Sequence, residues 1–175
     1  MHGIRVSAIM IPLEKYPHIL YTDSLQKAME VFEKSMLDID GQKSLPRGIL
    51  VFDENYNLMG IAGRRDILRG LEPDFLAEKP IAFRMELFNI EIDADQHAPF
   101  YQRIIDAASN QTGRSIKDVM KPVEVVVDYN DHIFKAIYLM NSHHMSLLPV
   151  LKDGEVVGII RTVDIFRKVK EILLR

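Results

Sequence analysis

The sequence predicts an α+β fold built from two copies of a β-α-β-β-α unit that pack face to face through their sheets. Two observations support this prediction. The stretches GIAGRRDI (Gly60–Ile67) and GIIRTVDI (Gly158–Ile165) share one frame. In both, a glycine is followed by two apolar residues, three variable residues, an aspartate and an isoleucine. In each half, an extended stretch, an apolar-striped helix and two apolar strands precede this frame in the same order. A duplicated order of parts indicates a repeated unit.

The bulk composition fits an ordinary globular chain with a sizeable core, since 47% of the 175 residues are hydrophobic and 27% are charged. The net charge of -3 and the lack of a basic cluster disfavour nucleic acid as the main partner. The absence of cysteine excludes disulfides and cysteine-based zinc sites. The N-terminus lacks the features of a signal peptide, and no apolar run of about 18 residues would span a membrane. We therefore expect a cytoplasmic protein.

Each half contains one predicted helix with apolar residues at i, i+3, i+4 and i+7, which place one apolar stripe toward a core. The stripes are Leu25, Ala28, Met29 and Phe32 in the first half, and Ile133, Ala136, Ile137 and Met140 in the second. Asp23 or Ser24 is expected to cap the first helix, and Asn130 or Asp131 the second, because these side chains accept from free N–H groups.

Two apolar strands follow each helix and are expected to form hairpins. In the second half, residues 147–151 and 156–160 flank KDGE, whose Asp-Gly pair favours a tight turn. In the first half, residues 48–52 and 58–62 flank the longer DENYN. Before the first hairpin, MLDIDGQKSLPRG (Met36–Gly48) has no counterpart in the second half, and its polarity predicts an exposed loop.

These elements divide the chain into a first repeat at 1–70, a linker at 71–114 and a second repeat at 115–175. Within the linker, AFRMELFNIEI (Ala82–Ile92) fits either a strand or a short helix. A further helix is expected from about Pro99 to Ser109, ending before Gly113.

The repeated pattern resembles a CBS domain pair, also called a Bateman module, over about residues 4–70 and 115–174. The matching motifs are Ile9–Met10, DVMKP (Asp118–Pro122), LPVLKDGEVVGII (Leu148–Ile160) and the closing frame of each half. The resemblance implies a regulatory module that binds an adenosine-type ligand, such as AMP, ADP, ATP or S-adenosylmethionine, in a cleft between its repeats. It also implies a homodimer that signals to an effector protein, with no catalytic role and no required cofactor.

The resemblance assigns a ribose-binding role to the aspartate of each frame, Asp66 and Asp164. An ionised carboxylate has two acceptor oxygens that suit the two neighbouring hydroxyls of a ribose. The alternative is a helix-stabilising role, because an aspartate in the first helical turn interacts favourably with the helix dipole.

The family often has serine or threonine three residues after the frame's glycine, where this chain has Gly63 and Arg161. Thr162 comes one position later. Arg161, Arg64 and Arg65 are candidate phosphate ligands, because guanidinium matches phosphate oxygens in a bidentate way. Solvated arginines are the alternative interpretation.

An adenine base would need apolar walls, which the resemblance assigns to five residues. These are Leu148, Pro149, Val150, Met120 and Pro122. Core packing is the alternative for Leu148, Val150 and Met120. His143 and His144 are candidate phosphate contacts; as neighbours on a helix they point about 100° apart and do not easily share one metal, so we expect no metal site.

The leading hypothesis is therefore a stand-alone regulatory CBS pair that binds an adenosine-type ligand and signals by a conformational shift. The alternative is a CBS-fold scaffold or dimerisation protein that has lost nucleotide binding. An enzyme is disfavoured, because the chain lacks a phosphate-binding loop, a nucleophile elbow and any thiol.

Overall fold

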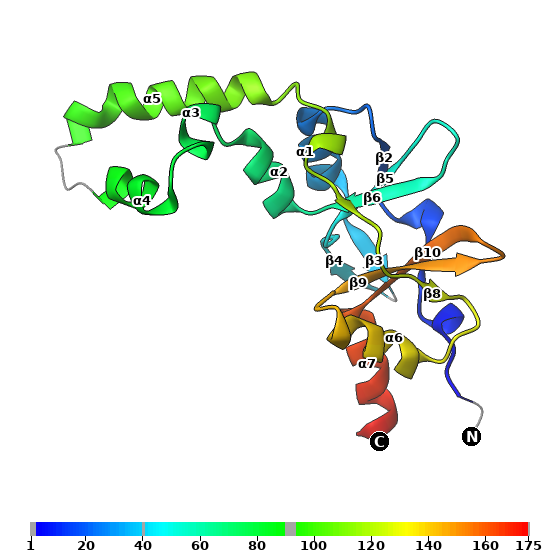
Figure 1. Ribbon diagram of the computed structural model, residues 1–175. Coiled ribbons are helices and arrows are strands. Elements are labelled where there is room, and N and C mark those ends of the chain that lie inside the picture. The colour runs from blue at the N-terminus through cyan, green and yellow to red at the C-terminus, as the bar shows by residue number, and fades with distance from the viewer. Residues whose placement is uncertain (1–2, 40, 90–93, 175) are drawn as a thin grey trace.

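The computed structural model describes residues 3–39, 41–89 and 94–174 and confirms the α+β fold with two repeats packed face to face (Figure 1). Each repeat is centred on one four-stranded sheet. The first sheet has the order β2 (His18–Leu20), β5 (Ile49–Phe52), β6 (Leu58–Ala62), β7 (Lys121–Pro122). The second has the order β1 (Ile11–Pro12), β10 (Glu155–Arg161), β9 (Leu147–Lys152), β8 (Val127–Asp128).

The two repeats exchange their first strands. Strand β1 lies near the start of the first repeat but pairs antiparallel with β10 of the second, and β7 lies near the start of the second repeat but pairs antiparallel with β6 of the first. The glycine of each repeated frame faces the exchanged strand. A Cβ on Gly158 would lie 2.4 Å from the Ile11 carbonyl oxygen, and a Cβ on Gly60 would lie 2.6 Å from the Lys121 carbonyl oxygen. Close backbone approach therefore explains why both frames begin with glycine.

The helices of the repeats follow the predicted apolar stripes. They are α1 (Leu25–Lys34) and α2 (Arg64–Leu71) in the first repeat, and α6 (Ile133–Ser142) and α7 (Thr162–Leu173) in the second. Three short 3-10 turns, Val6–Ala8, Leu13–Lys15 and Ile116–Asp118, complete the repeats.

The predicted cap is confirmed for α1 and wrong for α6. Ser24 caps α1, since its hydroxyl accepts from the Lys27 N–H at 3.1 Å. His132 caps α6, since its ring accepts from the Phe134 N–H. The Asp131 carboxylate instead accepts from the Asp128 N–H at 2.9 Å, which closes the turn before the helix. The helix therefore begins one residue later than the position that Asp131 would cap.

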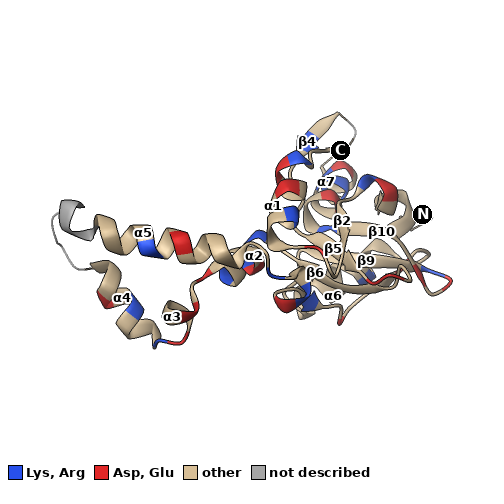
Figure 2. Cartoon of the chain, turned by 90° about the horizontal axis from the view of Figure 1, so that it is seen from above, with Lys and Arg blue, Asp and Glu red and all other residues tan. Residues whose placement is uncertain are grey.

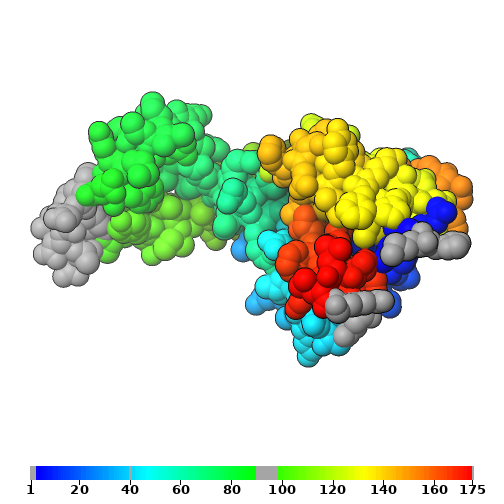
Figure 3. Space-filling model, turned by 90° about the horizontal axis from the view of Figure 1, so that it is seen from below, coloured from blue at the N-terminus to red at the C-terminus, as the bar shows by residue number. Residues whose placement is uncertain are grey.

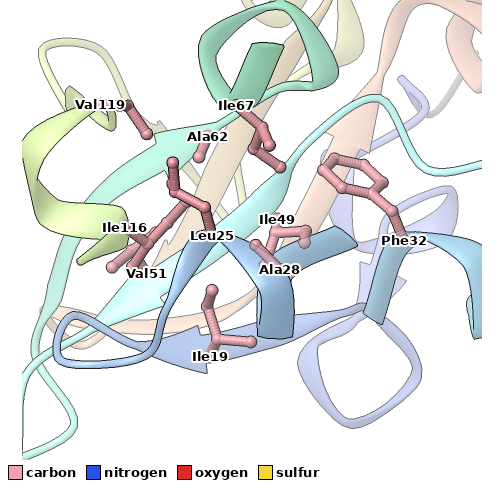
Figure 4. Close-up of a cluster of buried hydrophobic side chains, with 10 residues drawn as sticks. All are labelled: Ile19, Leu25, Ala28, Phe32, Ile49, Val51, Ala62, Ile67, Ile116 and Val119. Carbon is pink, nitrogen blue, oxygen red and sulfur yellow. The ribbon is translucent and has the colours of Figure 1, made fainter. Parts of the chain in front are cut away.

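Buried apolar residues form a core on the outer face of each sheet and a third core between the sheets. The first core is shown in Figure 4 and includes Ile116 and Val119 from the start of the second repeat. The second core includes Val6 from the N-terminal segment. The third core contains Ile11, Tyr16, Leu37, Leu50, Phe52, Leu147 and Ile159, which come from both repeats. The exchange of segments and this shared core hold the repeats together.

The hairpin strands agree closely with the sequence pattern, whereas the expected loop at 36–48 is wrong. Asp153 and Gly154 both have positive φ angles, 52° and 86°, as the Asp-Gly turn requires. Residues 36–48 contain a small hairpin of β3 (Leu37–Ile39) and β4 (Gln42–Ser44), and Leu37 is buried in the core between the sheets. The polar composition of residues 36–48 did not indicate a hairpin, because only Leu37 of β3 is fully buried in that core.

The residues between the repeats form helices that extend away from both sheets (Figures 1 and 3). They are α3 (Asp74–Ala77), α4 (Ile81–Asn89) and α5 (Ala94–Gln111). The ambiguous stretch 82–92 is helical up to Asn89, and its last three residues lie outside the described part. Helix α5 begins before Pro99, contrary to the expected start. The division of the chain at 70 and 115 stays a prediction. In the described part of the chain, we find no helix whose length and apolarity would suit a bilayer span.

Candidate functional site

Asp66 and Asp164 occupy equivalent places, at the third position of α2 and of α7. Both side chains are almost fully buried, with exposed fractions of 7% and 4%. The repeated frame places both aspartates in the first turn of a helix. Strand β6 ends at Ala62 and α2 begins at Arg64, while β10 ends at Arg161 and α7 begins at Thr162. Asp66 Oδ2 accepts from the Gly63 N–H at 2.9 Å and so closes the first turn of α2. The helix-stabilising role is therefore real for Asp66, but it uses only one carboxylate oxygen.

Asp66 lines a cavity of about 340 Å³ that both repeats form. Its walls are Arg47, Gly48, Ile61, Gly63 and Arg65 of the first repeat, Lys121, Pro122 and Val123 around the exchanged strand β7, and Met145, Ser146 and Leu147 of the second repeat. We call this space the Asp66 cavity. Its volume falls within the range of about 300–1,000 Å³ that is typical of small-molecule sites.

The second oxygen of Asp66 is the unusual group in this cavity. Asp66 Oδ1 is buried and takes part in no hydrogen bond. The nearest cations, Arg69 Nη2 and Lys121 Nζ, each lie 3.3 Å from it, which is an ion-pair distance without hydrogen-bond geometry. The two ion pairs balance the charge of this oxygen but supply no hydrogen bond, so a ligand hydroxyl could donate to it.

Positive charge surrounds the same acceptor. Arg47, Arg65 and Lys121 line the Asp66 cavity and are exposed at its rim. A cavity lined by one carboxylate and three cations suits a ligand with a hydroxyl group at one end and an anionic group at the other.

Asp164 has a different environment, because Arg161 binds it from within the same chain. Arg161 Nε donates to Asp164 Oδ2 at 2.6 Å, and Arg161 Nη2 donates to Asp164 Oδ1 at 2.8 Å. The arginine is only 1% exposed, and its Nη1 donates to the Ser44 hydroxyl on β4 at 3.1 Å. The guanidinium therefore holds both carboxylate oxygens of Asp164 and is itself covered by the β3–β4 hairpin of the other repeat.

Asp164 lines a second cavity, of about 280 Å³, together with residues 8–12, Lys15, Asp38, Ile39, Arg167, Lys168 and Glu171. Tyr16 packs in the core between the sheets, and the charges of Arg161 and Asp164 influence its pKa. Burial raises the pKa of Tyr16 to about 12, although the Gly48 N–H and Arg161 act in the opposite direction.

Of the remaining polar candidates, only Arg65 lines the Asp66 cavity. Arg64 donates to the Pro46 carbonyl at 2.8 Å and stacks over the Phe32 ring, so it faces away from the Asp66 cavity, whereas Arg65 lines it. Thr162 lies on the outer face between α6 and α7. His143 and His144 are exposed where α6 ends, next to residues of the cavity wall but not in it.

The apolar candidates divide between core and cavity. Leu148 and Val150 belong to the second core, and Pro149 is buried between them on β9. Met120 packs against the first core. Of these five residues, only Pro122 lines the Asp66 cavity.

Sequence reasoning missed three residues that shape the two sites. Lys121 and Arg47 supply charge to the Asp66 cavity, and Ser44 covers the Arg161–Asp164 pair. Lys121 lies within the quoted DVMKP motif, so a signal existed. Ser44 lies 117 residues from Arg161, and no local pattern links the two.

The chain matches the CBS domain over residues 6–73 and 116–171. Among similar solved structures are CBSX2 in complex with AMP (23% identity, TM-score 0.62, covering 97% of this chain and 98% of that one) and CBSX2 from Arabidopsis thaliana (20%, 0.65, 99% and 99%). The cytosolic domain of the Mg²⁺ channel MgtE in complex with ATP is also similar (16%, 0.58, 94% and 48%). No curated protein sequence matches the chain. At these identities the structures show a shared fold. With two matched segments that together cover most of its length, the chain belongs to the CBS domain family and forms a CBS pair.

Proposed function

We propose that this CBS pair is a regulatory module that binds an adenosine-type ligand in the Asp66 cavity and has no catalytic role. The observation that carries the proposal is the buried Oδ1 of Asp66, which accepts no hydrogen bond and lies at a cavity formed by both repeats. A ribose offers two neighbouring hydroxyls as donors, and a carboxylate is the natural acceptor for them.

The cations of the Asp66 cavity favour a phosphorylated ligand. Arg47, Arg65 and Lys121 suit the phosphates of AMP, ADP or ATP. S-adenosylmethionine carries a net positive charge and would meet repulsion from the same side chains. Ile61, Pro122 and Leu147 offer apolar surface to a purine. The complexes of CBSX2 with AMP and of the MgtE cytosolic domain with ATP support this ligand class.

The signal would arise from the position of the cavity between the repeats. A ligand that contacts Arg65 of one repeat and Ser146 of the other changes the relative free energies of different repeat arrangements. Such coupling is typically about 1–3 kcal/mol. We propose that a second copy of this chain and an effector protein respond to that shift.

A CBS-fold scaffold without nucleotide binding is the second candidate. The observation that favours it is the Arg161–Asp164 pair, because Arg161 already occupies the carboxylate that the repeated frame places at the second site. The scaffold also requires that no ligand binds in the Asp66 cavity. The residue equivalent to Arg161 is Gly63 there, and Asp66 pairs with Arg69 and Lys121 at the longer distance of 3.3 Å.

Thermal unfolding with AMP, ADP, ATP and S-adenosylmethionine separates the two candidates. A ligand at 100 times its dissociation constant adds about 2.7 kcal/mol to the free energy of unfolding, which corresponds to about 5–10 °C for a chain of this size. Asp66→Asn keeps an oxygen for the Gly63 N–H but removes the charge, so we expect it to weaken binding by at least about tenfold. Asp153→Asn in the distant hairpin turn is the matched control. No shift with any ligand would favour the scaffold.

A further inference from the structure

A cavity of about 480 Å³ lies between the turns of the two hairpins. Both turns are at the end of the paired repeats that lies away from α3, α4 and α5 (Figures 1 and 2). The lining includes Phe52 and residues 55–58 of the first hairpin, and Leu151 and residues 154–156 of the second. We call this space the turn cavity. It is separate from the Asp66 cavity, and its volume is also typical of a small-molecule site.

The walls of the turn cavity are apolar and carry one charge. Glu155 is the single charged residue among the described residues that line it, and within the described chain its carboxylate has no hydrogen bond or ion pair. Lys152 lies opposite Glu155 in the β9–β10 ladder, but its Nζ lies 5.1 Å from the centre of the Tyr129 ring. The aliphatic walls are Leu13, Leu58, Val123, Val126, Leu151 and Val156. The turn cavity therefore favours a ligand with an apolar body and a positive charge, whereas the Asp66 cavity favours an anion.

Tyr56 lines the turn cavity in a backbone conformation that tyrosine rarely adopts. Its φ angle of 65° lies in the left-handed region, where a bulky residue is an outlier. Its ring stacks on Phe52, with the ring centroids 5.0 Å apart. The Asp53 carboxylate fixes the turn, since it accepts from the N–H groups of Asn55 and Asn57 at 2.9 and 2.8 Å. Glycine or asparagine would suit this turn better, and strained residues of this kind gather at ligand sites.

The hydrogen bonds of His18 leave the Tyr56 oxygen able to accept. His18 Nδ1 lies 2.9 Å from the Tyr16 carbonyl oxygen, which can only accept, so Nδ1 carries the proton. In the neutral ring, Nε2 is then an acceptor, and the Tyr56 hydroxyl donates to it at 2.9 Å. The Tyr56 oxygen keeps its lone pairs, and the face of its ring attracts cations. An ammonium group matches both properties, because it carries N–H donors and a positive charge.

We propose that the turn cavity binds a small primary amine, whose ammonium group is recognised by Tyr56 and Glu155 and whose apolar body packs on the aliphatic walls. The inference does not depend on a nucleotide in the Asp66 cavity. Val123 lines both cavities, so the amine and a nucleotide would share a wall. The two hairpins belong to different repeats, and an amine that contacts both therefore favours particular arrangements of the repeats.

Titration of the isotope-labelled full chain with phenethylamine, without nucleotide, tests the proposal through the chemical shifts of its backbone amides. We expect saturable shifts of the Asn57 and Gly154 signals, which come from the two turns. Phenylpropionate has the same apolar body and the opposite charge, and we expect it to cause no such shift. A missing response to the amine would refute the proposal, as would equal responses to the two compounds.

Substitutions locate the bound amine. Tyr56→Asn removes the ring but suits the left-handed backbone, so we expect a folded variant whose dissociation constant for phenethylamine rises at least about tenfold. Glu155→Gln should raise this constant about threefold, because the carboxylate is exposed. The matched control is Glu54→Gln, which removes an acidic charge from the other turn, where Glu54 contacts Tyr21, and should leave the constant unchanged.

Asp66→Asn distinguishes the turn cavity from the Asp66 cavity, whose carboxylate could also attract an amine. We expect phenethylamine to bind this variant as it binds the wild type. Binding that is lost in Asp66→Asn but kept in Tyr56→Asn would place the amine in the Asp66 cavity and overturn the proposal. This result would leave the nucleotide proposal to its own unfolding measurements.

Discussion

The buried ion pair of Arg161 and Asp164 allows a sharp test of the site assignment through protein stability. Arg161→Met keeps much of the side-chain volume but removes the guanidinium. It thereby removes the two donors to Asp164, at 2.6 and 2.8 Å, and the donor to Ser44. The carboxylate stays behind in the interior, where its side chain is only 4% exposed.

The expected magnitude follows from this burial. Removal of one partner from a buried ion pair lowers the free energy of unfolding by about 3–5 kcal/mol. For a chain of this size, each kcal/mol corresponds to about 2–4 °C, so the melting temperature should fall by about 6–20 °C. An exposed pair would contribute at most about 1 kcal/mol.

The double variant Arg161→Met/Asp164→Leu is the matched control, because it removes both charges and fills the space with apolar atoms. Replacement of a whole buried ion pair by apolar residues is often neutral. We therefore expect the double variant to regain most of the stability lost in the single variant. Urea unfolding of the three proteins, analysed with a common m-value, measures these differences.

Three results would refute this reasoning. A loss below about 1 kcal/mol in Arg161→Met would show that the pair is exposed in solution. Unchanged stability together with weaker binding of ATP would show that Arg161 faces the ligand, as the sequence alone suggested. A double variant as unstable as the single variant would show that the cost arises from packing and not from the uncompensated charge.

Three further predictions concern the fold and the Asp66 cavity. Gly158→Ala should lower the free energy of unfolding by about 1–3 kcal/mol, since its Cβ would meet the Ile11 carbonyl; Gly113→Ala, with open space around it, should be neutral in the same urea titration. The pKa of Tyr16 is raised to about 12, so the folded protein holds this proton more tightly than the unfolded chain. The resulting stability is present below pH 10 and is lost as pH rises to 12, and the wild type should lose about 3 kcal/mol more than Tyr16→Phe over that interval; equal losses would contradict it. Lys121→Met should weaken ATP more than adenosine in calorimetric titrations, because only ATP carries charge for Lys121 to neutralise, and equal effects on both ligands would argue against phosphate contact.

Local patterns were sufficient for much of the fold. The Asp-Gly turn at 153–154 and the apolar strands around it follow from residue types within a few positions of one another. The start of α1 at Ser24 follows in the same way, because a cap acts over three residues. His132 escaped prediction because a histidine ring is an uncommon cap, and β3 escaped because only one of its three residues, Leu37, is buried.

The sequence by itself determined that the chain has two repeats, an α+β fold and one acidic side chain at the start of each closing helix. Only the tertiary structure decided what surrounds those two carboxylates. Lys121 reaches Asp66 because β7 crosses to the other repeat, and Ser44 reaches Arg161 because β3 and β4 fold over it. Periodicity and capping act within one or two turns of chain, whereas these contacts join segments that lie tens of residues apart. Equal positions in the repeats therefore became a carboxylate with one oxygen free of hydrogen bonds in Asp66 and a bidentate ion pair in Asp164.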